Sequence, residues 1–214
     1  MKRALLPSLV IVAVGVLAAC KDPSVDKPRA TVSAAVAAPA VAPPAPGTTW
    51  VLEPGSSSIE WTGSKVTGKH DGSFGKFAGT VTVPGGRFED ARIAVEIETA
   101  SLASDNPKLE GHLRSPDFFD VEKFPKASFS STGVVAEASD QGTHRITGNL
   151  LLHGVTKSIS FPARIAITDG KPSATAEFSI NRKDFGLVYP GMPDDLIRDG
   201  VVIRLKIAPT RSAP

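Results

Sequence analysis

The stretch KSISFPARIAIT, residues 157–168, decides the fold class, because its apolar and polar residues alternate along the chain. Successive side chains of a β-strand point to opposite faces, so this pattern is typical of a strand with one buried face. The apolar face carries Ile159, Phe161, Ala163, Ile165 and Ile167. The stretch therefore predicts a half-buried strand of an antiparallel sheet.

The same alternation recurs along most of the chain between residues 48 and 210. It is clearest in segments 77–83, 91–98, 144–152, 173–181 and 201–207. Clusters of Gly, Pro and Asp separate these segments, for example at 84–86 and 140–142, and such clusters are typical of tight turns. About eight short strands of this kind predict an all-β, eight-stranded antiparallel barrel, with a sandwich as the alternative.

One segment breaks the strand pattern. Asp105-Asn106-Pro107 offers a capping side chain and a proline for the first turn of a helix, and Leu109 and Leu113 recur four residues apart. The following stretch, HLRSPDFFDVEKFPKASF (residues 112–129), carries four phenylalanines among charged residues. We expect a short helical insertion that closes one end of the barrel. We expect Phe118, Phe119 and Phe124 to face inward. The charged side chains are expected to remain in water, namely Asp117, Asp120, Glu122, Lys123 and Lys126.

The amino terminus predicts export and a lipid anchor. Residues 1–19 combine a short basic start with an apolar stretch shorter than the roughly 20 residues that span a bilayer, which is typical of a signal peptide. The stretch ends in Leu-Ala-Ala-Cys and resembles a bacterial lipobox, which implies lipidation of Cys20. Lys21 follows, so we expect a periplasmic, lipid-anchored protein at the outer membrane.

The segment behind the expected anchor, residues 20–47, is rich in Ala and Pro and has no large side chain between positions 30 and 46. Prolines prevent a continuous helix there, and too little apolar surface is present for a core. We expect a flexible tether, followed by a barrel domain at 48–210 and a disordered tail at 211–214.

Charge and motifs argue against nucleic-acid binding, catalysis and a metal centre. Removal of Lys2 and Arg3 with the signal peptide leaves 22 basic and 22 acidic residues, so no basic surface is indicated. The four histidines lack metal-ligand spacing, and Cys20 is the only cysteine. No serine lies in a nucleophile elbow. We therefore expect no enzyme activity, no metal and no cofactor.

Four stretches together resemble the YceI-like family: HLRSPDFFDVEKFPKASF, GNLLLHGVTKSISFPA (148–163), INRKDFGLVYPG (180–191) and DGVVIRLKI (199–207). The resemblance extends in order over residues 49–207. It implies a periplasmic, lipocalin-like barrel that binds a polyisoprenoid, a quinone-type lipid or a related amphiphile inside. The lipobox and the Ala/Pro segment lie outside the family's usual pattern.

The alternation and the resemblance together give a candidate site. The candidate cavity-lining residues are Val95, Ile97, Leu113, Phe118, Phe119, Phe129, Leu150, Leu152, Ile159, Phe161, Ala163, Phe178, Ile180 and Phe185. Candidates for contact with a polar head group are His112, Arg182 and Asp184, although an ion pair between Arg182 or Asp184 and the insertion is an equal alternative. Burial of a hydrocarbon chain would stabilise the complex by about 25 cal/mol per Å² of apolar area.

A second hypothesis belongs to another functional class. Periodicity identifies an inner face but not an empty space, so a filled barrel that binds another envelope protein through its outer surface fits the same pattern. The sequence leaves the oligomeric state open, and a homodimer is compatible with it. The partners expected from the first hypothesis are a hydrophobic lipid and, through acylated Cys20, the membrane.

Overall fold

The computed structural model describes residues 21–37, 47–168 and 170–212 of the 214-residue chain. The predicted signal peptide (1–19), Cys20, part of the predicted tether (38–46) and the last two residues lie outside the described residues. Among the described helices, none combines the length and the apolar character that crossing a membrane requires.

Within these ranges, thirteen strands form one sheet, and two more form a small hairpin. The strands of the sheet are β1 (Thr31–Ala34), β2 (Gly47–Leu52), β3 (Ser58–Lys65), β4 (Gly68–Phe74), β5 (Phe77–Pro84), β6 (Arg92–Glu98), β7 (Leu102–Ser104), β8 (Lys126–Ser139), β9 (Gly142–Leu152), β10 (Val155–Thr168), β11 (Lys171–Asn181), β14 (Gly200–Ile207) and β15 (Thr210–Arg211). The hairpin is β12 (Gly191–Met192) with β13 (Asp195–Leu196).

The pairings close a barrel of eight chain passages within the described residues. Four passages are each split by an irregularity into two strands, namely β2 with β3, β4 with β5, β6 with β7, and β14 with β15. The passage β2/β3 pairs with β4/β5 on one side and with β14/β15 on the other. The remaining neighbours run from β6/β7 through β8, β9, β10 and β11 to β14. The predicted antiparallel barrel is confirmed, although the strands are more finely divided than expected.

The alternation of the sequence accounts for the strands. In β6, Arg92, Glu96 and Glu98 are exposed, while Ile93, Val95 and Ile97 between them face the interior. Each of the six segments with clear alternation lies in a strand, with ends within about two residues of those expected. In β10 the inward face does not include Ile167, which is 59% exposed near the end of that strand.

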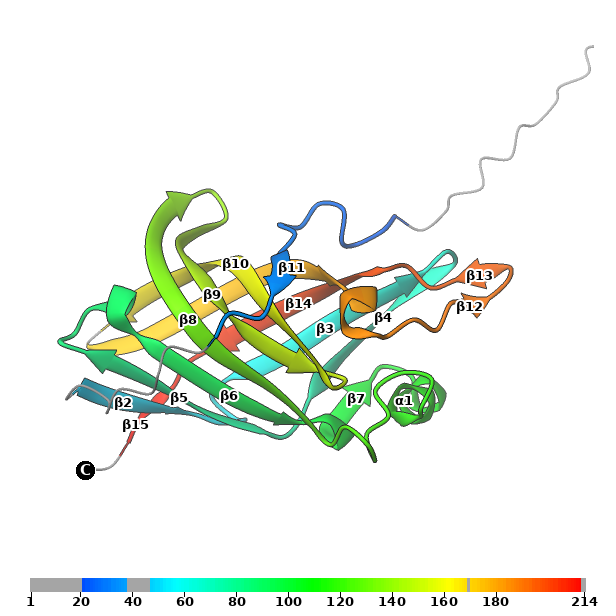
Figure 1. Ribbon diagram of the computed structural model, residues 1–214, viewed down its shortest axis with the longest axis horizontal. Helices are drawn as coiled ribbons and strands as arrows, with labels where there is room; N and C mark the ends of the chain where they lie inside the picture. The colour runs from blue at the N-terminus through cyan, green and yellow to red at the C-terminus, as the bar shows by residue number, and fades with distance from the viewer. Residues whose placement is uncertain (1–20, 38–46, 169, 213–214) are drawn as a thin grey trace, which may run out of the picture.

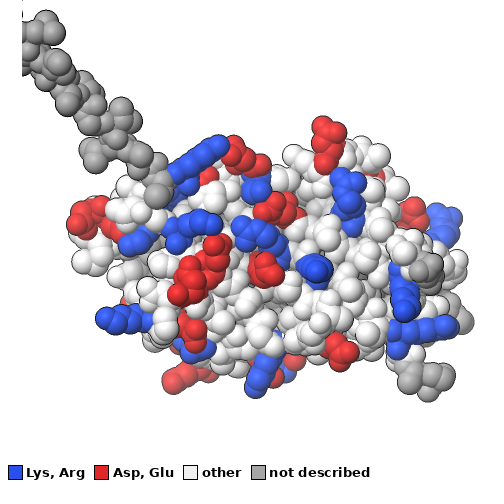
Figure 2. Space-filling view, turned by 180° about the vertical axis from the view of Figure 1, so that it is seen from behind, with Lys and Arg blue, Asp and Glu red and all other residues white. Residues whose placement is uncertain are grey.

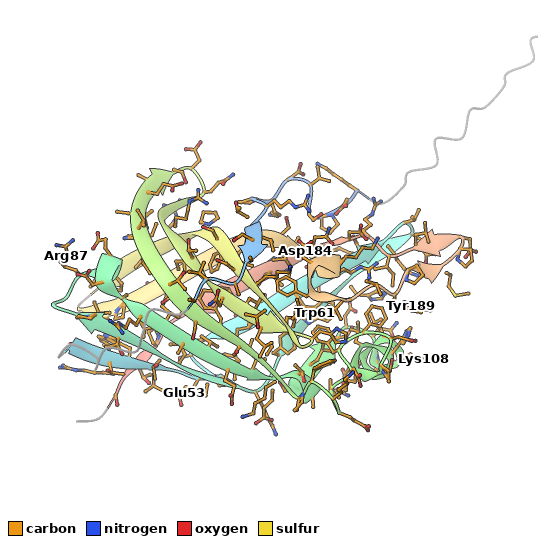
Figure 3. All side chains as sticks on the ribbon, viewed as in Figure 1. Glu53, Trp61, Arg87, Lys108, Asp184 and Tyr189 are labelled. Atoms are coloured by element: carbon orange, nitrogen blue, oxygen red, sulfur yellow. The ribbon has the colours of Figure 1, made fainter. Side chains whose placement is uncertain are left out.

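The helical insertion lies where it was predicted, between β7 and β8. Helix α1 (Pro107–Arg114) begins after Asn106, whose side chain accepts hydrogen bonds from the backbone N–H groups of Lys108 and Leu109. A series of turns follows and carries Phe118 before β8 begins. Figure 1 shows α1 and β7 at one end of the barrel, beside the β12–β13 hairpin. The short 3₁₀ helix η1 (Phe88–Asp90) lies at the opposite end, where Figure 3 labels Arg87.

Part of the segment predicted as a tether is a strand, because β1 (Thr31–Ala34) pairs with the barrel. The pairing between β10 and β11 stops at Arg164, and nearer the start of β10 strand β1 pairs with residues 157–160 instead. Arg29 forms a backbone bridge to Ser179 of β11, so the segment fills the seam between the two strands (Figure 1). We name residues 28–34 the strap. Backbone hydrogen bonds hold the strap, Ala30 is its one fully buried residue, and Val32 packs against the main core cluster.

An outer ion-pair network secures the segment before the strap. Lys27 Nζ lies 2.7 Å from Glu177 Oε2, and Glu177 Oε1 lies 2.9 Å from Arg204 Nε. Arg204 also donates to the hydroxyl of Thr62, which in turn donates to Asp71. These contacts join the amino-terminal segment to β11, β14, β3 and β4.

The predicted disordered tail is also wrong in part. Arg211 pairs with Trp50 of β2, and the N–H of Ser212 donates to the carbonyl of Thr49. Strand β15 continues the passage of β14 and completes the wall beside β2. Residues 213–214 lie outside the described part.

Candidate functional site

A cavity of about 410 Å³ runs through the barrel, and its lining is almost entirely apolar. Side chains from both core clusters of the protein contribute, so the cavity reaches from Leu52 and Pro209 near one end to Leu109 near the other. The sequence-predicted residues that line it are Val95, Ile97, Leu113, Phe118, Phe119, Phe129, Leu150, Leu152, Ile159, Phe161, Ala163, Phe178 and Ile180.

Several inward side chains are only half-buried, which distinguishes this barrel from a packed core. Ile93, Val95 and Ile97 point inward from β6 and are of intermediate burial, although their outward neighbours are fully exposed. Close-packed interiors leave few voids larger than a water molecule, so inward side chains of a filled barrel would be fully buried. The surface that these residues retain faces the cavity.

Aromatic rings form one wall. Phe161 and Phe178 stack with ring centroids 4.2 Å apart and planes 13° from parallel. Phe129 contacts Phe161 at 5.9 Å in a tilted arrangement. The three side chains come from β10, β11 and β8, so the ring cluster joins three strands of the barrel wall.

The helical insertion supplies the lining at its end of the barrel. Leu109, Leu113, Phe118 and Phe119 all line the cavity. Phe119 contacts Phe74 of β4 edge-on, with centroids 5.9 Å apart. The expectation that this insertion presents its apolar side chains to the interior is therefore correct for both central phenylalanines.

Phe124 differs from the expectation, because it packs on His153 with centroids 4.6 Å apart instead of lining the cavity. His153 lies in a turn in the left-handed region, with φ at 50°. The Cβ of a larger residue at Gly154 would lie 2.4 Å from the Phe124 ring. This histidine and this phenylalanine therefore hold the turn between β9 and β10 against the end of the insertion.

Arg182 is the predicted head-group residue that the structure places at the cavity. It is only 4% exposed, and its guanidinium donates to the carbonyls of Arg198, Leu187 and Ile197. Desolvation by burial lowers the pKa of Arg182 from its usual range. Its nearest carboxylate is Asp199 at 3.6 Å, so the alternative of an ion pair with the insertion is wrong.

Three predicted site residues do not line the cavity. Phe185 is fully buried, but β11 ends at Asn181 and the chain turns into the 3₁₀ helix η3 (Arg182–Phe185), which carries the ring away from the inner face. Asp184 is partly exposed on the same helix (Figure 3). His112 contacts the Phe118 ring edge-on, and its Nε2 lies 2.9 Å from the carboxylate oxygen Oδ2 of Asp117.

Sequence reasoning missed the lining residues on β3 and β4, which are Ile59, Trp61, Gly63, Ser64, Lys65, His70 and Phe74. Trp61 lies over Gly72, where a Cβ would be only 2.2 Å from the indole ring. Lys65 pairs with Asp195, and His70 Nδ1 lies 2.8 Å from Asp105 Oδ1. The strand β4 has the sequence GKHDGSF, whose polar and glycine residues gave no alternating signal. The only usable signal was Trp61, one of the chain's two tryptophans, in an alternating stretch.

Charged groups are otherwise dispersed. In the described part of the chain, no group of three or more His, Cys, Asp or Glu side chains is placed to hold a metal ion. Figure 2 shows basic and acidic side chains interspersed over one face. The cavity thus offers a long apolar surface with a few polar groups, which can hold a hydrocarbon chain by burial.

A family model described as a YceI-like domain matches residues 50–208 of the chain, which is nearly the whole barrel. This chain belongs to the YceI-like family. Among similar YceI-like sequences, a UPF0312 protein of Pseudomonas putida (strain W619) is 36% identical over 126 residues, which cover 56% of this chain and 65% of the relative. The chain thus spans less than two thirds of that relative's length. A UPF0312 protein of Azotobacter vinelandii is 41% identical over 100 residues, or 47% of this chain and 50% of the relative.

Solved structures agree on the fold. BcnA of Burkholderia cenocepacia has a TM-score of 0.62 at 19% identity, covering 71% of this chain and 94% of its own. A polyisoprenoid binding domain from Saccharophagus degradans has a TM-score of 0.61 at 14% identity, covering 78% of this chain and all of its own. At these identities the likeness concerns the fold.

Proposed function

We propose that this YceI-like protein binds one long-chain amphiphilic lipid, of the isoprenoid or quinone type, inside the barrel. The observation that carries the proposal is the apolar cavity bordered by half-buried inward side chains such as Val95. A polyisoprenoid binding domain with the same fold supports the choice of lipid class. The protein acts by holding the lipid, for carriage, storage or a stress response, and not by catalysis.

The chemistry of the lining suits a flexible hydrocarbon chain. Aliphatic and phenylalanine side chains offer no directional bonds, so affinity would come from removal of apolar surface from water, at about 25 cal/mol per Å². A lipid tail in the cavity would also complete the packing around Ile93 and Ile97, which retain surface toward the interior.

We also propose that the protein is a periplasmic lipoprotein acylated at Cys20 and held at the outer membrane. Because the strap lies against the barrel, an acylated Cys20 would hold the barrel directly at the membrane surface. The cavity would then be within reach of lipid that leaves the bilayer.

A pair of tryptophan substitutions on β6 tests the binding proposal. Val95 faces the cavity, whereas the adjacent Ala94 is exposed on the outer face. Val95→Trp should fill part of the cavity and reduce retention of a fluorescent long-chain probe. Ala94→Trp introduces the same side chain outside and should retain the probe as the unsubstituted protein does. Fully buried Ala163 is a poorer position, because a large residue there would overpack the wall.

Two results would contradict the proposal. One is equal probe retention in both variants, if circular dichroism shows that both are folded. The other is failure of the unsubstituted, lipid-free protein to bind any long-chain probe. Either result would favour the alternative of an envelope lipoprotein that acts through its outer surface.

A further inference from the structure

A second cleft, of about 780 Å³, adjoins the barrel cavity. Ile180, Arg182 and Ile197 line both spaces. The cleft lies between the segment before the strap, the start of η3 and the residues that follow the β12–β13 hairpin. A molecule in the barrel therefore has a second, chemically different space immediately beside it, at Arg182.

Cationic side chains predominate in this cleft. The basic lining residues are Lys27, Arg29, Arg182, Lys183 and Arg198, and the acidic ones are Asp22 and Asp199. Asp199 lies 2.9 Å from Lys183 Nζ, and Asp22 lies 3.9 Å from Arg198 Nη1. Lys27 is neutralised from outside the lining by Glu177. The two lining carboxylates therefore leave a positive excess.

Arg182 is the residue of the cleft whose position is fixed by burial and by hydrogen bonds. Only 4% of its surface is exposed, and hydrogen bonds to three carbonyl oxygens hold its guanidinium in a fixed position. A guanidinium has more N–H groups than three carbonyls use, and its rigid fork matches carboxylate and phosphate oxygens. A buried cation with a carboxylate no closer than 3.6 Å would gain from a closer anion.

We propose that the bound lipid is an acidic amphiphile of the phosphate or diphosphate class. Its tail occupies the barrel, and its head group lies in the cationic cleft beside Arg182, Lys183 and Arg29. This inference rests on the proposed lipid-binding function and narrows it, because a neutral quinone would leave the cleft unused. It also gives the amino-terminal segment a part in binding, since that segment contributes Arg29 and Lys27.

The test compares three probes by calorimetry on lipid-free protein: geranylgeranyl diphosphate, geranylgeraniol and inorganic diphosphate. The first two share a tail and differ in head group. We expect the prenyl diphosphate to bind at least about tenfold more tightly than the alcohol, as one or two charge-assisted hydrogen bonds would provide. This difference should shrink as salt is added.

A double variant, Arg29→Gln with Lys183→Gln, removes two exposed charges from the cleft and leaves buried Arg182 in place. It should weaken binding of the prenyl diphosphate by about tenfold and leave the alcohol unchanged. The matched control is Lys108→Gln with Lys171→Gln, two exposed lysines outside the cleft lining. The control should bind both prenyl probes as the unsubstituted protein does.

Three results would contradict these proposals, and each one contradicts a different part. Equal affinity for the alcohol and the diphosphate would overturn the head-group inference and leave the lipid-binding proposal intact. Inorganic diphosphate that binds as tightly as the prenyl diphosphate would show a site for a free anion instead of a lipid head. If neither prenyl probe binds, the proposed function itself fails.

Discussion

Phe161 and Phe178 stack face to face, with centroids 4.2 Å apart, at the seam where β10 and β11 separate. The last hydrogen-bonded pair of this interface is Arg164 with Thr175, and the same register brings the two rings opposite each other. The rings therefore hold the strands together just where backbone hydrogen bonds end. Beyond them, the strap takes the place of direct pairing.

The strap should be released by a charge at its one buried position. Ala30 is 4% exposed and belongs to the main core cluster, so a carboxylate at this position would be buried without a partner. We expect Ala30→Glu to raise amide hydrogen exchange in residues 157–160 of β10 and at Ser179. Mass spectrometry of peptic fragments measures this exchange.

Ala34→Glu is the matched control, because Ala34 is exposed at the end of β1. It should leave exchange in β10 unchanged. Equal protection in the Ala30→Glu variant and in the unsubstituted protein would show that the strap contributes nothing to closure of the seam.

Gly72 should be intolerant of a side chain, because it makes room for the indole of Trp61. A Cβ at this position would lie 2.2 Å from the ring and 2.3 Å from the carbonyl of Ala103. Overpacking of this kind costs about 1–3 kcal/mol, so Gly72→Ala should lower the free energy of unfolding by that amount in urea titrations. Gly68→Ala, on the same strand with no atom within 4 Å, should cost nothing. Equal losses in the two variants would exclude the Trp61 contact as the cause.

Glu177 should make folding stability depend on pH in the acid range. Hydrogen bonds from Lys27 and Arg204 lower the pKa of Glu177 below its usual value. The unfolded chain therefore takes up the proton first, so this contribution is full above the unfolded pKa and is lost as pH falls through the folded pKa. We expect Glu177→Gln to be less stable than the unsubstituted protein at neutral pH, and the difference to disappear in acid.

Urea titrations from neutral pH to about pH 3 measure this difference. Glu122→Gln, at an exposed position on the insertion, is the control and should show no such trend. A gap between Glu177→Gln and the unsubstituted protein that stays constant over the whole range would contradict the role of the Lys27–Glu177–Arg204 network.

Membrane attachment should depend on Cys20. If its sulfur is acylated, Cys20→Ala will abolish incorporation of a labelled fatty acid and move the protein from the membrane fraction to the soluble periplasmic fraction. Lys21→Asp should redirect the protein to the inner membrane while leaving the label in place. Unchanged fractionation of Cys20→Ala would refute the anchor.

The sequence was sufficient for the barrel wall, because alternation reports directly which residues share a face. Val95, Ile97 and Phe161 were placed correctly on that basis. The sequence was insufficient to predict segments whose structure depends on backbone hydrogen bonds instead of on the character of the side chains. The strap consists mostly of small residues and contributes only Ala30 and Val32 to the core, so its composition resembled a tether. It is ordered only because β10 and β11 leave hydrogen-bonding groups open beside it.

The polar parts of the site were harder to predict for a related reason. Arg182 was identified, but Arg29 and Arg198 are distant in the sequence and meet it only through folding. Phe185 was expected in the cavity because it is apolar and close to β11. Because η3 replaces the strand from Arg182 onward, alternation no longer applies at Phe185, and alternation cannot predict the residue at which a strand ends.

The most direct test of lipid binding is the mass of the protein, together with any bound lipid, after purification from cells. The protein, exported to the periplasm of an isoprenoid-producing host and purified without detergent, should be weighed by native mass spectrometry and then extracted with solvent. We predict one long-chain lipid per barrel, absent from the Val95→Trp variant and present in Ala94→Trp. A bare protein mass that does not change when long-chain lipids are added back would contradict the account.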